Sequence, residues 1–373
     1  MRKLISAVLA LSILLTASGC SGGSIYSNYL DIAELLVVRT LGFDLDADGG
    51  VRLSAAAEGG SGADGSESRA PVRLCAAAAS VTEAQDELRH YGGGLRLFFG
   101  HTAYIVLGES VLGSGTAQFF DCIERDADLR LCIPVFAVSS GSAEELVTGT
   151  GSDGYDATKL IHAVTENLRL RGDAHVFTAA EIVSSLDRNG AALICAVKTV
   201  SRDGGESAIV PDGYTIIYNG RAAGHIPAEL ARGVSILLNE TGSLPVTLGD
   251  AALLLDSSVC ETTPVFGDGG LEGVSFDIAL GASLAEARGG FEPAELEREL
   301  ALAVRGWVES VLALQSDTGC DFLHLGSILE MQEPKRLRGA GRSFALIAPN
   351  LSYTVSVSAA IDRSFHLDLS QAN

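Results

Sequence analysis

LFFGHTAYIVLGESVLGSGTAQFFDCIERDADLRLCIPVFAVS, residues 97–139, alternates apolar runs of strand length with one segment of helical character. Residues 97–108 and 131–139 have the pattern of buried strands, and residues 110–125 between them have the pattern of a helix. A strand, a helix and a strand in this order imply helices packed on a sheet. The stretch therefore predicts a mixed α/β or α+β architecture.

Similar signals extend this pattern in both directions along the chain. Strand-like runs cover residues 35–43, 51–58, 71–79 and 191–200. Three capping boxes, each a Ser or Thr followed three residues later by Glu, mark helix starts at Ser80, Ser142 and Thr178. Asn219-Gly220 between two short apolar runs predicts a type I′ hairpin. The polar segment 201–207 before it is the best candidate for a domain boundary.

The C-terminal third combines strand patterns at 244–255 and 273–284 with one long helix. Residues 293–315 place a stripe of apolar side chains on one helical face, namely Leu296, Leu300, Val304, Trp307, Val311 and Leu314. The last strand, 351–361, alternates so that Tyr353, Val355, Val357 and Ala359 face the same side. With 373 residues, the chain is long enough for two or three domains.

The first twenty residues have the pattern of a lipoprotein signal peptide. Arg2 and Lys3 precede an uncharged apolar run at 4–16, and Ala17-Ser18-Gly19 leads directly into Cys20. We expect residues 1–19 to be the leader, with cleavage between Gly19 and Cys20 and lipid attached to the Cys20 thiol. The alternative is an ordinary secreted protein with a chance cysteine near the cleavage site. Residues 20–30 are predicted to be a flexible tether.

The formal net charge is −21, and removal of Arg2 and Lys3 with the leader would make it −23. Such an acidic surface repels nucleic acid and anionic headgroups, so neither is an expected partner. After the leader, no run of eighteen apolar residues suggests a membrane-spanning helix. Contact with a membrane would therefore depend on the lipid anchor.

Six cysteines remain besides Cys20, and they are Cys75, Cys122, Cys132, Cys195, Cys260 and Cys320. In an exported protein they could form three disulfides. Their even scatter and the absence of any C-x-x-C pair favour buried free thiols instead, and give no zinc site.

No pattern in the sequence predicts an active site, a metal site or a cofactor. The run from Asp44 to Gly49 copies the start of a calcium loop, but Ala55 stands where the bidentate Glu would be required, so we interpret it as a hairpin turn. Gly113-Ser-Gly115 lacks the third glycine of a phosphate loop, and His101 has no nearby ligand or base in the sequence. We therefore expect a protein that binds or assembles.

Several segments together resemble the C-subunit lipoproteins of bacterial spore germinant receptors, the Ger(x)C-type spore germination proteins. They occur in the family's order over roughly residues 31–363. The segments are Leu35 to Asp44 with its L-G-F-D ending, Leu97 to His101 with Ile105 to Glu109, Arg125 to Arg130, Gly213 to Gly224 with Glu229 to Gly233, and finally Gln315, Asp321, Leu325-Gly326 and Pro349 to Leu351.

The resemblance implies a non-enzymatic lipoprotein with three small mixed α/β and α+β domains, at residues 31–205, 206–262 and 263–365. It implies assembly with A-type and B-type integral-membrane subunits on the outer face of the inner spore membrane, where the receptor triggers germination in response to nutrients. Only Cys20 carries over with a defined chemical role. The departure from the family lies at Ser21-Gly22-Gly23-Ser24, where a Trp and charged residues are usual. A solute-binding lipoprotein of a transporter is the alternative, and an extracellular hydrolase is a weaker one.

Overall fold

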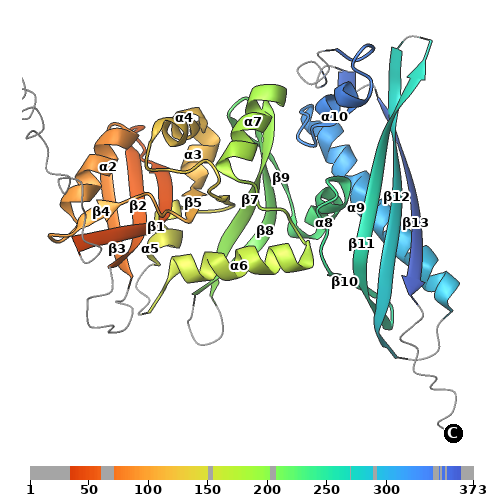
Figure 1. Cartoon of the computed structure of the whole chain (residues 1–373), viewed down its shortest axis with the longest axis horizontal. Helices are drawn as coiled ribbons and strands as arrows, with labels where there is room; N and C mark the ends of the chain where they lie inside the picture. The colour runs from red at the N-terminus through yellow and green to blue at the C-terminus, as the bar shows by residue number, and fades with distance from the viewer. Residues whose placement is uncertain are drawn as a thin grey trace, which may run out of the picture.

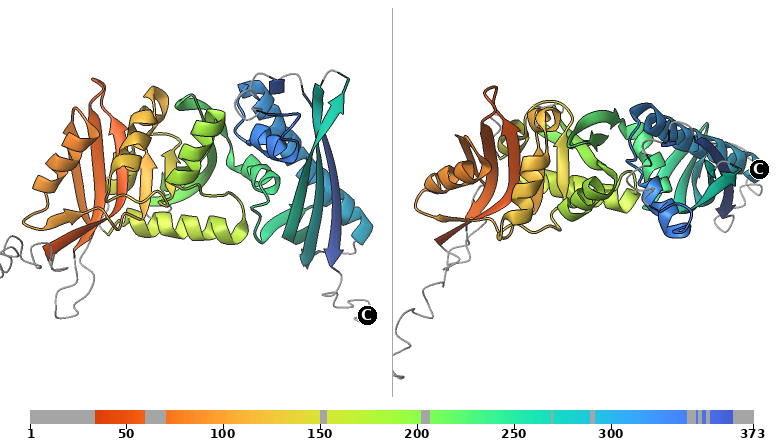
Figure 2. Two further views of the ribbon diagram at one scale, coloured as in Figure 1. Left: turned by 45° about the horizontal axis from the view of Figure 1, so that its top comes forward. Right: turned by 90° about the horizontal axis from the view of Figure 1, so that it is seen from above.

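The computed structural model describes residues 34–59, 71–149, 154–201, 207–268, 270–288, 292–338, 344, 347–348 and 351–362. These residues form an elongated molecule with one sheet toward each end (Figure 1). The view from above shows the same arrangement, with helices on both faces of the first sheet (Figure 2). The described part is thus mixed α/β, as the sequence predicts.

The first sheet contains nine strands among the described residues, in the order β3-β2-β1-β5-β6-β7-β8-β9, with β4 beside β1. Strands β1, β5, β6 and β7 are parallel, and antiparallel strands extend the sheet on both sides. The strands are β1 Leu35–Leu45, β2 Val51–Gly59, β3 Val72–Ala78, β4 Arg96–Phe98, β5 Tyr104–Leu107, β6 Val135–Val138, β7 Ala191–Ser201, β8 Ser207–Tyr218 and β9 Arg221–Ile226.

Helices cover both faces of this sheet because the crossovers between parallel strands require it. One face packs against α2 (Val81–His90), α4 (Ala117–Arg125) and α7 (Ala179–Asn189). The other packs against α5 (Ala143–Thr148) and α6 (Ala157–Arg171). The helix α3 (Glu109–Ser114) follows β5 directly and contacts β1, β6 and β9.

The second sheet has the order β10-β11-β12-β13, and β13 pairs parallel to β12. The strands β10 (Leu244–Leu248), β11 (Ala251–Gly267), β12 (Gly270–Ala287) and β13 (Ser352–Asp362) are covered on one face by α9 (Pro293–Thr318). The predicted alternation in β13 is confirmed, because Tyr353, Val355, Val357 and Ala359 are all less exposed than their neighbours. The shorter helix α10 (Leu325–Gln332) follows α9.

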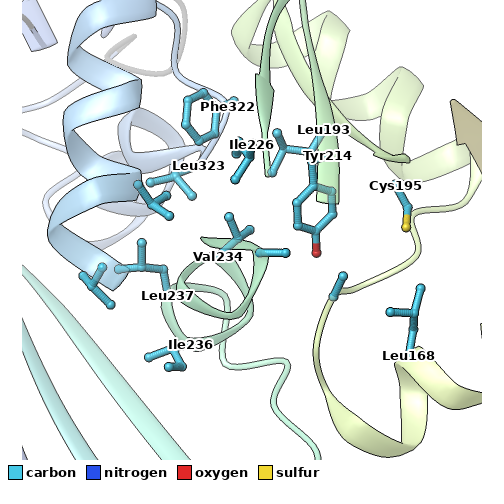
Figure 3. Close-up of a cluster of buried hydrophobic side chains, with 14 of the residues drawn as sticks. Leu168, Leu193, Cys195, Tyr214, Ile226, Val234, Ile236, Leu237, Phe322 and Leu323 are labelled. Carbon is cyan, nitrogen blue, oxygen red and sulfur yellow. The ribbon is translucent and has the colours of Figure 1, made fainter. Parts of the chain in front are cut away.

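The helix α8 (Ala228–Leu237) joins the two sheets. It contacts β8 in the first sheet, and β11 and α9 in the second. Figure 3 shows Val234 and Leu237 of α8 beside Leu323, with Tyr214 of β8 in the same cluster. One continuous hydrophobic core therefore runs through α8 from the first sheet into the second.

Local signals that depend on near neighbours are confirmed. Thr178 and Glu181 form a reciprocal capping box at the start of α7. Asn219 and Gly220 both have positive φ, at 49° and 77°, as a type I′ turn requires. The long helix keeps its apolar stripe, with Leu296, Leu300 and Val304 buried.

Three predicted elements are interrupted, one by a local turn and two by contacts from distant parts of the chain. The strand expected at 97–108 is β4 and β5, separated by a turn in which Thr102 donates to the Phe99 carbonyl. The helix expected at 110–125 breaks at Gly115, since the Thr116 amide donates to Gly220 O of the β8–β9 turn. The strand expected at 131–139 shortens to β6, because the carbonyls of Leu131 and Ile133 accept from the first amides of α7.

The domain boundaries expected at 205/206 and 262/263 fall within continuous sheets. Strands β7 and β8 on either side of the first boundary pair from Ala191 opposite Tyr218 to Ser201 opposite Ser207. The second boundary lies inside β11. We propose instead that the described chain divides once, at the connection between α8 and β10, where the first sheet has ended and the second begins.

Candidate functional site

The residues proposed for lipidation lie outside the described part of the chain. They are the leader 1–19, the cleavage pair Gly19 and Cys20, and the tether 20–30. The lipid on Cys20 therefore stays a prediction. Within the described ranges, no helix is both long and apolar enough to cross a bilayer.

Asp44, at the end of the family-like opening strand, is a buried carboxylate that binds the start of α5. Its Oδ1 accepts from the Ala143 amide at 2.9 Å, and its Oδ2 accepts from the Glu144 amide at 2.8 Å. Burial raises the pKa of Asp44, and the two amide hydrogen bonds oppose this shift. The carboxylate thus accepts hydrogen bonds from two of the backbone amides that have no partner within the helix at its N-terminus.

Gly108 leaves room for this carboxylate, and Gly42 leaves room for the neighbouring Ser54 side chain. Parallel pairing of β1 with β5 brings the amide of Gly108 to 2.9 Å from Phe43 O. A Cβ on Gly108 would overlap Asp44 Oδ1, and a Cβ on Gly42 would overlap Ser54 Oγ. The segments 41–44 and 105–109, which carry the family resemblance, therefore meet in one tightly packed polar site.

The run that resembles a calcium loop is a hairpin turn, as interpreted from the sequence. Strands β1 and β2 pair as an antiparallel hairpin, and Arg52 binds Asp46 at 3.0 Å and Glu144 at 3.2 Å. A hollow of about 560 Å³ is lined by Asp46, Arg52 and Glu144, together with Glu109 and Ser110. In the described residues no group of three His, Cys, Asp or Glu side chains could hold a metal ion.

Asp321, in the other half of the molecule, is a second buried carboxylate that binds the first amides of a helix. Asp321 accepts from the Leu325 and Gly326 amides, both at 2.8 Å, at the start of α10. Gln315 of α9 accepts from the Leu323 amide at 3.0 Å. Burial raises the pKa of Asp321 to about 6, although the two amides oppose the shift. Gln315, Asp321 and Leu325-Gly326, which are separate in the family-like ending, form one site.

His324 is a functional candidate that the sequence reasoning missed. It adopts a left-handed conformation with φ of 58°, and its Nδ1 contacts the Asn189 side-chain amide at the end of α7. Ser327 donates to Asn189 Oδ1 at 2.8 Å. Burial, and next the charge of Arg188, lower the pKa of His324 to about 4, so the ring is neutral at pH 7. A lone histidine gives no sequence signal for such a contact.

His101 and the cysteines show no catalytic arrangement. His101 is exposed in the turn after β4 and its ring contacts Phe98 edge-on. The six cysteines of the described residues are unpaired, and Cys195, Cys260 and Cys320 are buried. Burial raises the pKa of Cys195 to about 12, which keeps that thiol protonated. Cys132 is exposed, unlike the buried thiols expected from its apolar run.

Comparison with known proteins agrees with the architecture. Residues 28–199 match the family described as "Spore germination protein N-terminal domain". The solved structure titled "Crystal Structure of the GerBC protein" is similar, with a TM-score of 0.51 at 17% identity, over 86% of this chain and 96% of that one. No curated protein matches the chain. The chain is thus similar to spore germination proteins over residues 28–199, and it shares the fold of GerBC.

Proposed function

We propose that this protein is the non-enzymatic, lipid-anchored C subunit of a nutrient germinant receptor. It assembles with A-type and B-type integral-membrane subunits on the outer face of the inner spore membrane. The observation that carries the proposal is the germination-domain match over residues 28–199. The GerBC-like fold, which extends over most of the chain, supports it.

The anchor follows from Cys20 and from the charge of the chain. A body with a formal net charge of −21 does not adsorb to an anionic bilayer through its surface. Two or more acyl chains on Cys20 would hold it firmly, at about 0.8 kcal/mol per buried methylene. Confinement near the membrane raises the effective concentration of the subunit beside its partners.

A binding role, not a catalytic one, agrees with how the buried polar groups are used. Asp44 and Asp321 each accept two backbone hydrogen bonds, so their oxygens hold helices in place. The solute-binding alternative calls for two α/β lobes around a cleft. In the described chain the second sheet differs from the first in size and topology.

The anchoring part of the proposal is tested by replacing Cys20. Cys20→Ala should move the protein from the membrane fraction of spores to the soluble fraction and reduce nutrient-triggered germination. Cys132→Ala is the matched control, because Cys132 is exposed and unpaired in the structure. Membrane retention and normal germination of the Cys20→Ala strain would contradict the anchor.

The assembly part needs a separate measurement. Purification of the tagged, full-length protein from detergent-solubilised spore membranes should recover two multi-span membrane proteins in constant ratio. Recovery of the chain alone, from membranes in which it is properly lipidated, would contradict assembly and leave the anchor standing.

A further inference from the structure

Strand β13 is an outer strand of the second sheet (Figure 1). In the described part of the chain it pairs only with β12, along all eleven of its residues. The segment from Ser352 to Ile361 contains no charged residue and no proline, in a chain of which 20% is charged. Proteins usually protect such an edge, because a long uncharged edge strand readily pairs with a strand of another chain.

The other sheet edges of the described chain carry such protection. The outer strands β3, β9 and β10 have only seven, six and five residues, and β10 includes Pro245. Where β11 extends beyond β10, Asn239 bonds both the amide and the carbonyl of Cys260, and Gln332 donates to the carbonyl of Thr262. By contrast, β13 is long and continuous in its register with β12.

The free side of β13 presents backbone hydrogen-bonding groups. The amide of Ile361 donates to the Glu297 carboxylate of α9 at 3.1 Å, so it points away from β12. Because the direction of the amides alternates along a strand, those of Val355 and Val357 point to the same side as that of Ile361. Glu297 therefore covers the end of this edge, and the segment 352–358 remains for a partner strand.

The sequence of β13 is complementary to itself. In an antiparallel pair about a two-fold axis at Val355, Ser352 lies opposite Ser358 of the second copy, and Tyr353 lies opposite Val357. Two exposed side chains then meet on one face, and two less exposed side chains meet on the face that α9 covers. Such a two-fold contact is closed, since each copy uses the same surface.

Local charge permits the approach of two copies although the formal net charge of the chain is −21. At physiological ionic strength, exposed charges more than about 8 Å apart are largely screened. Asp277 of β12 lies beside Ser356. Both β13 strands would separate the two copies of Asp277, which places them about 14 Å apart or more at the usual strand spacing.

We propose that β13 pairs antiparallel with β13 of a second copy of this protein, so that two four-stranded sheets become one continuous sheet. The paired segment is 352–358, which leaves the contact between Glu297 and Ile361 in place. The inference depends on the second sheet alone and not on the proposed receptor function.

Sedimentation of the full-length, detergent-solubilised protein over a range of concentrations tests the pairing. The wild type should show an equilibrium between one and two copies. Ser352→Lys/Ser358→Lys should weaken dimerisation at least about tenfold, because lysines would then lie opposite each other across the axis. Both serines are exposed, so circular dichroism should show that the variant folds like wild type.

A matched control and a charge exchange make the test specific. Val259 and Val265 are exposed in β11 and lie in the same two rows of the sheet, two strands from the edge. Val259→Lys/Val265→Lys should therefore dimerise like wild type. Ser352→Glu/Ser358→Glu should dimerise weakly alone, but a mixture of this variant with the edge-lysine variant should form mixed dimers, since opposite charges then face each other.

Three results would overturn the proposal. They are a wild type that sediments as one copy at every concentration, equal dimerisation of the edge and control variants, and no mixed dimer from the two edge variants. An edge variant that dimerises normally but no longer recovers multi-span membrane proteins would also overturn it, and would assign the edge to those proteins. Failure of the wild type to recover them would contradict the proposed assembly and leave the dimer standing.

Discussion

Asp44 binds the amide of Ala143 at 2.9 Å although 99 residues separate the two. The contact ties the end of β1 to the start of α5, across a sheet edge that also holds Gly108. The Asp44 side chain, near the end of β1, thus positions α5, which lies in the connection between β6 and β7.

Substitution at Gly108 should disrupt this contact. Gly108→Ala places a methyl group where Asp44 Oδ1 lies, so either the carboxylate or the backbone must move. We expect a loss of about 2–4 kcal/mol in the free energy of unfolding, measured by urea denaturation. Gly113→Ala in the neighbouring helix is the control, because a Cβ there meets nothing within 4 Å. It should be neutral or stabilising, and equal losses in the two variants would contradict the assigned role of Gly108.

Replacement of Asp321 should change how stability depends on pH. The pKa of Asp321 is about 6 in the folded protein against a reference of 3.8, so its favourable contribution is full below pH 3.8 and is lost as the pH rises through 6. Asp321→Asn removes this loss. Between pH 4 and 7 the variant should gain on the order of 3 kcal/mol relative to wild type, whatever its absolute stability. Parallel stability curves for the two proteins would contradict a buried, titrating Asp321.

His324 should show the opposite pH dependence. Its pKa is about 4 in the folded protein against 6.5, so its contribution is full above pH 6.5 and is lost as the pH falls through 4. His324→Asn keeps a residue that tolerates the left-handed backbone and removes the titration. The stability of the variant should fall less than that of wild type from pH 7 to 4, as measured by thermal unfolding. His90→Asn, with an exposed ring on α2, should match wild type.

The contact of α8 with α9 should be sensitive to one methyl group. A Cβ on Gly233 would lie 2.9 Å from the Trp307 carbonyl oxygen and 3.1 Å from a Val311 methyl. Gly233→Ala should therefore destabilise the protein by about 1–3 kcal/mol and shift the emission of Trp307, the single tryptophan of the chain. Gly306→Ala on α9 meets nothing within 4 Å and should be neutral or stabilising. Unchanged emission and stability of the Gly233 variant would argue against close packing of these helices.

Signals that act over a few residues were sufficient for much of the fold. The Thr178 capping box, the Asn219-Gly220 turn and the stripe from Leu296 to Val311 each depend on spacing alone, and the structure confirms all three. The break in the helix expected at 110–125 could not be predicted in the same way. It depends on the bond from Thr116 to Gly220, which lies more than a hundred residues later.

The polar sites were less predictable because their partners are distant or are backbone atoms. Asp44 was interpreted correctly as part of a hairpin, but its pattern says nothing of Ala143. Asp321 binds amides only a few residues ahead, yet its pattern in the sequence does not reveal the burial that raises its pKa. The segment 201–207 is polar like a linker, and its composition gives no sign that the flanking strands β7 and β8 pair with each other.

The helix α8 also determines how force would pass through the molecule. It begins at Ala228, two residues after β9 ends, with Pro227 as its N-cap. Beyond α8, the Ser243 amide donates to Leu170 O of α6 at 3.1 Å. The shared hydrophobic core and this hydrogen bond couple the two sheets on either side of α8. A force applied at β13 would therefore be transmitted through α8 to β9, and the two sheets would move as one body.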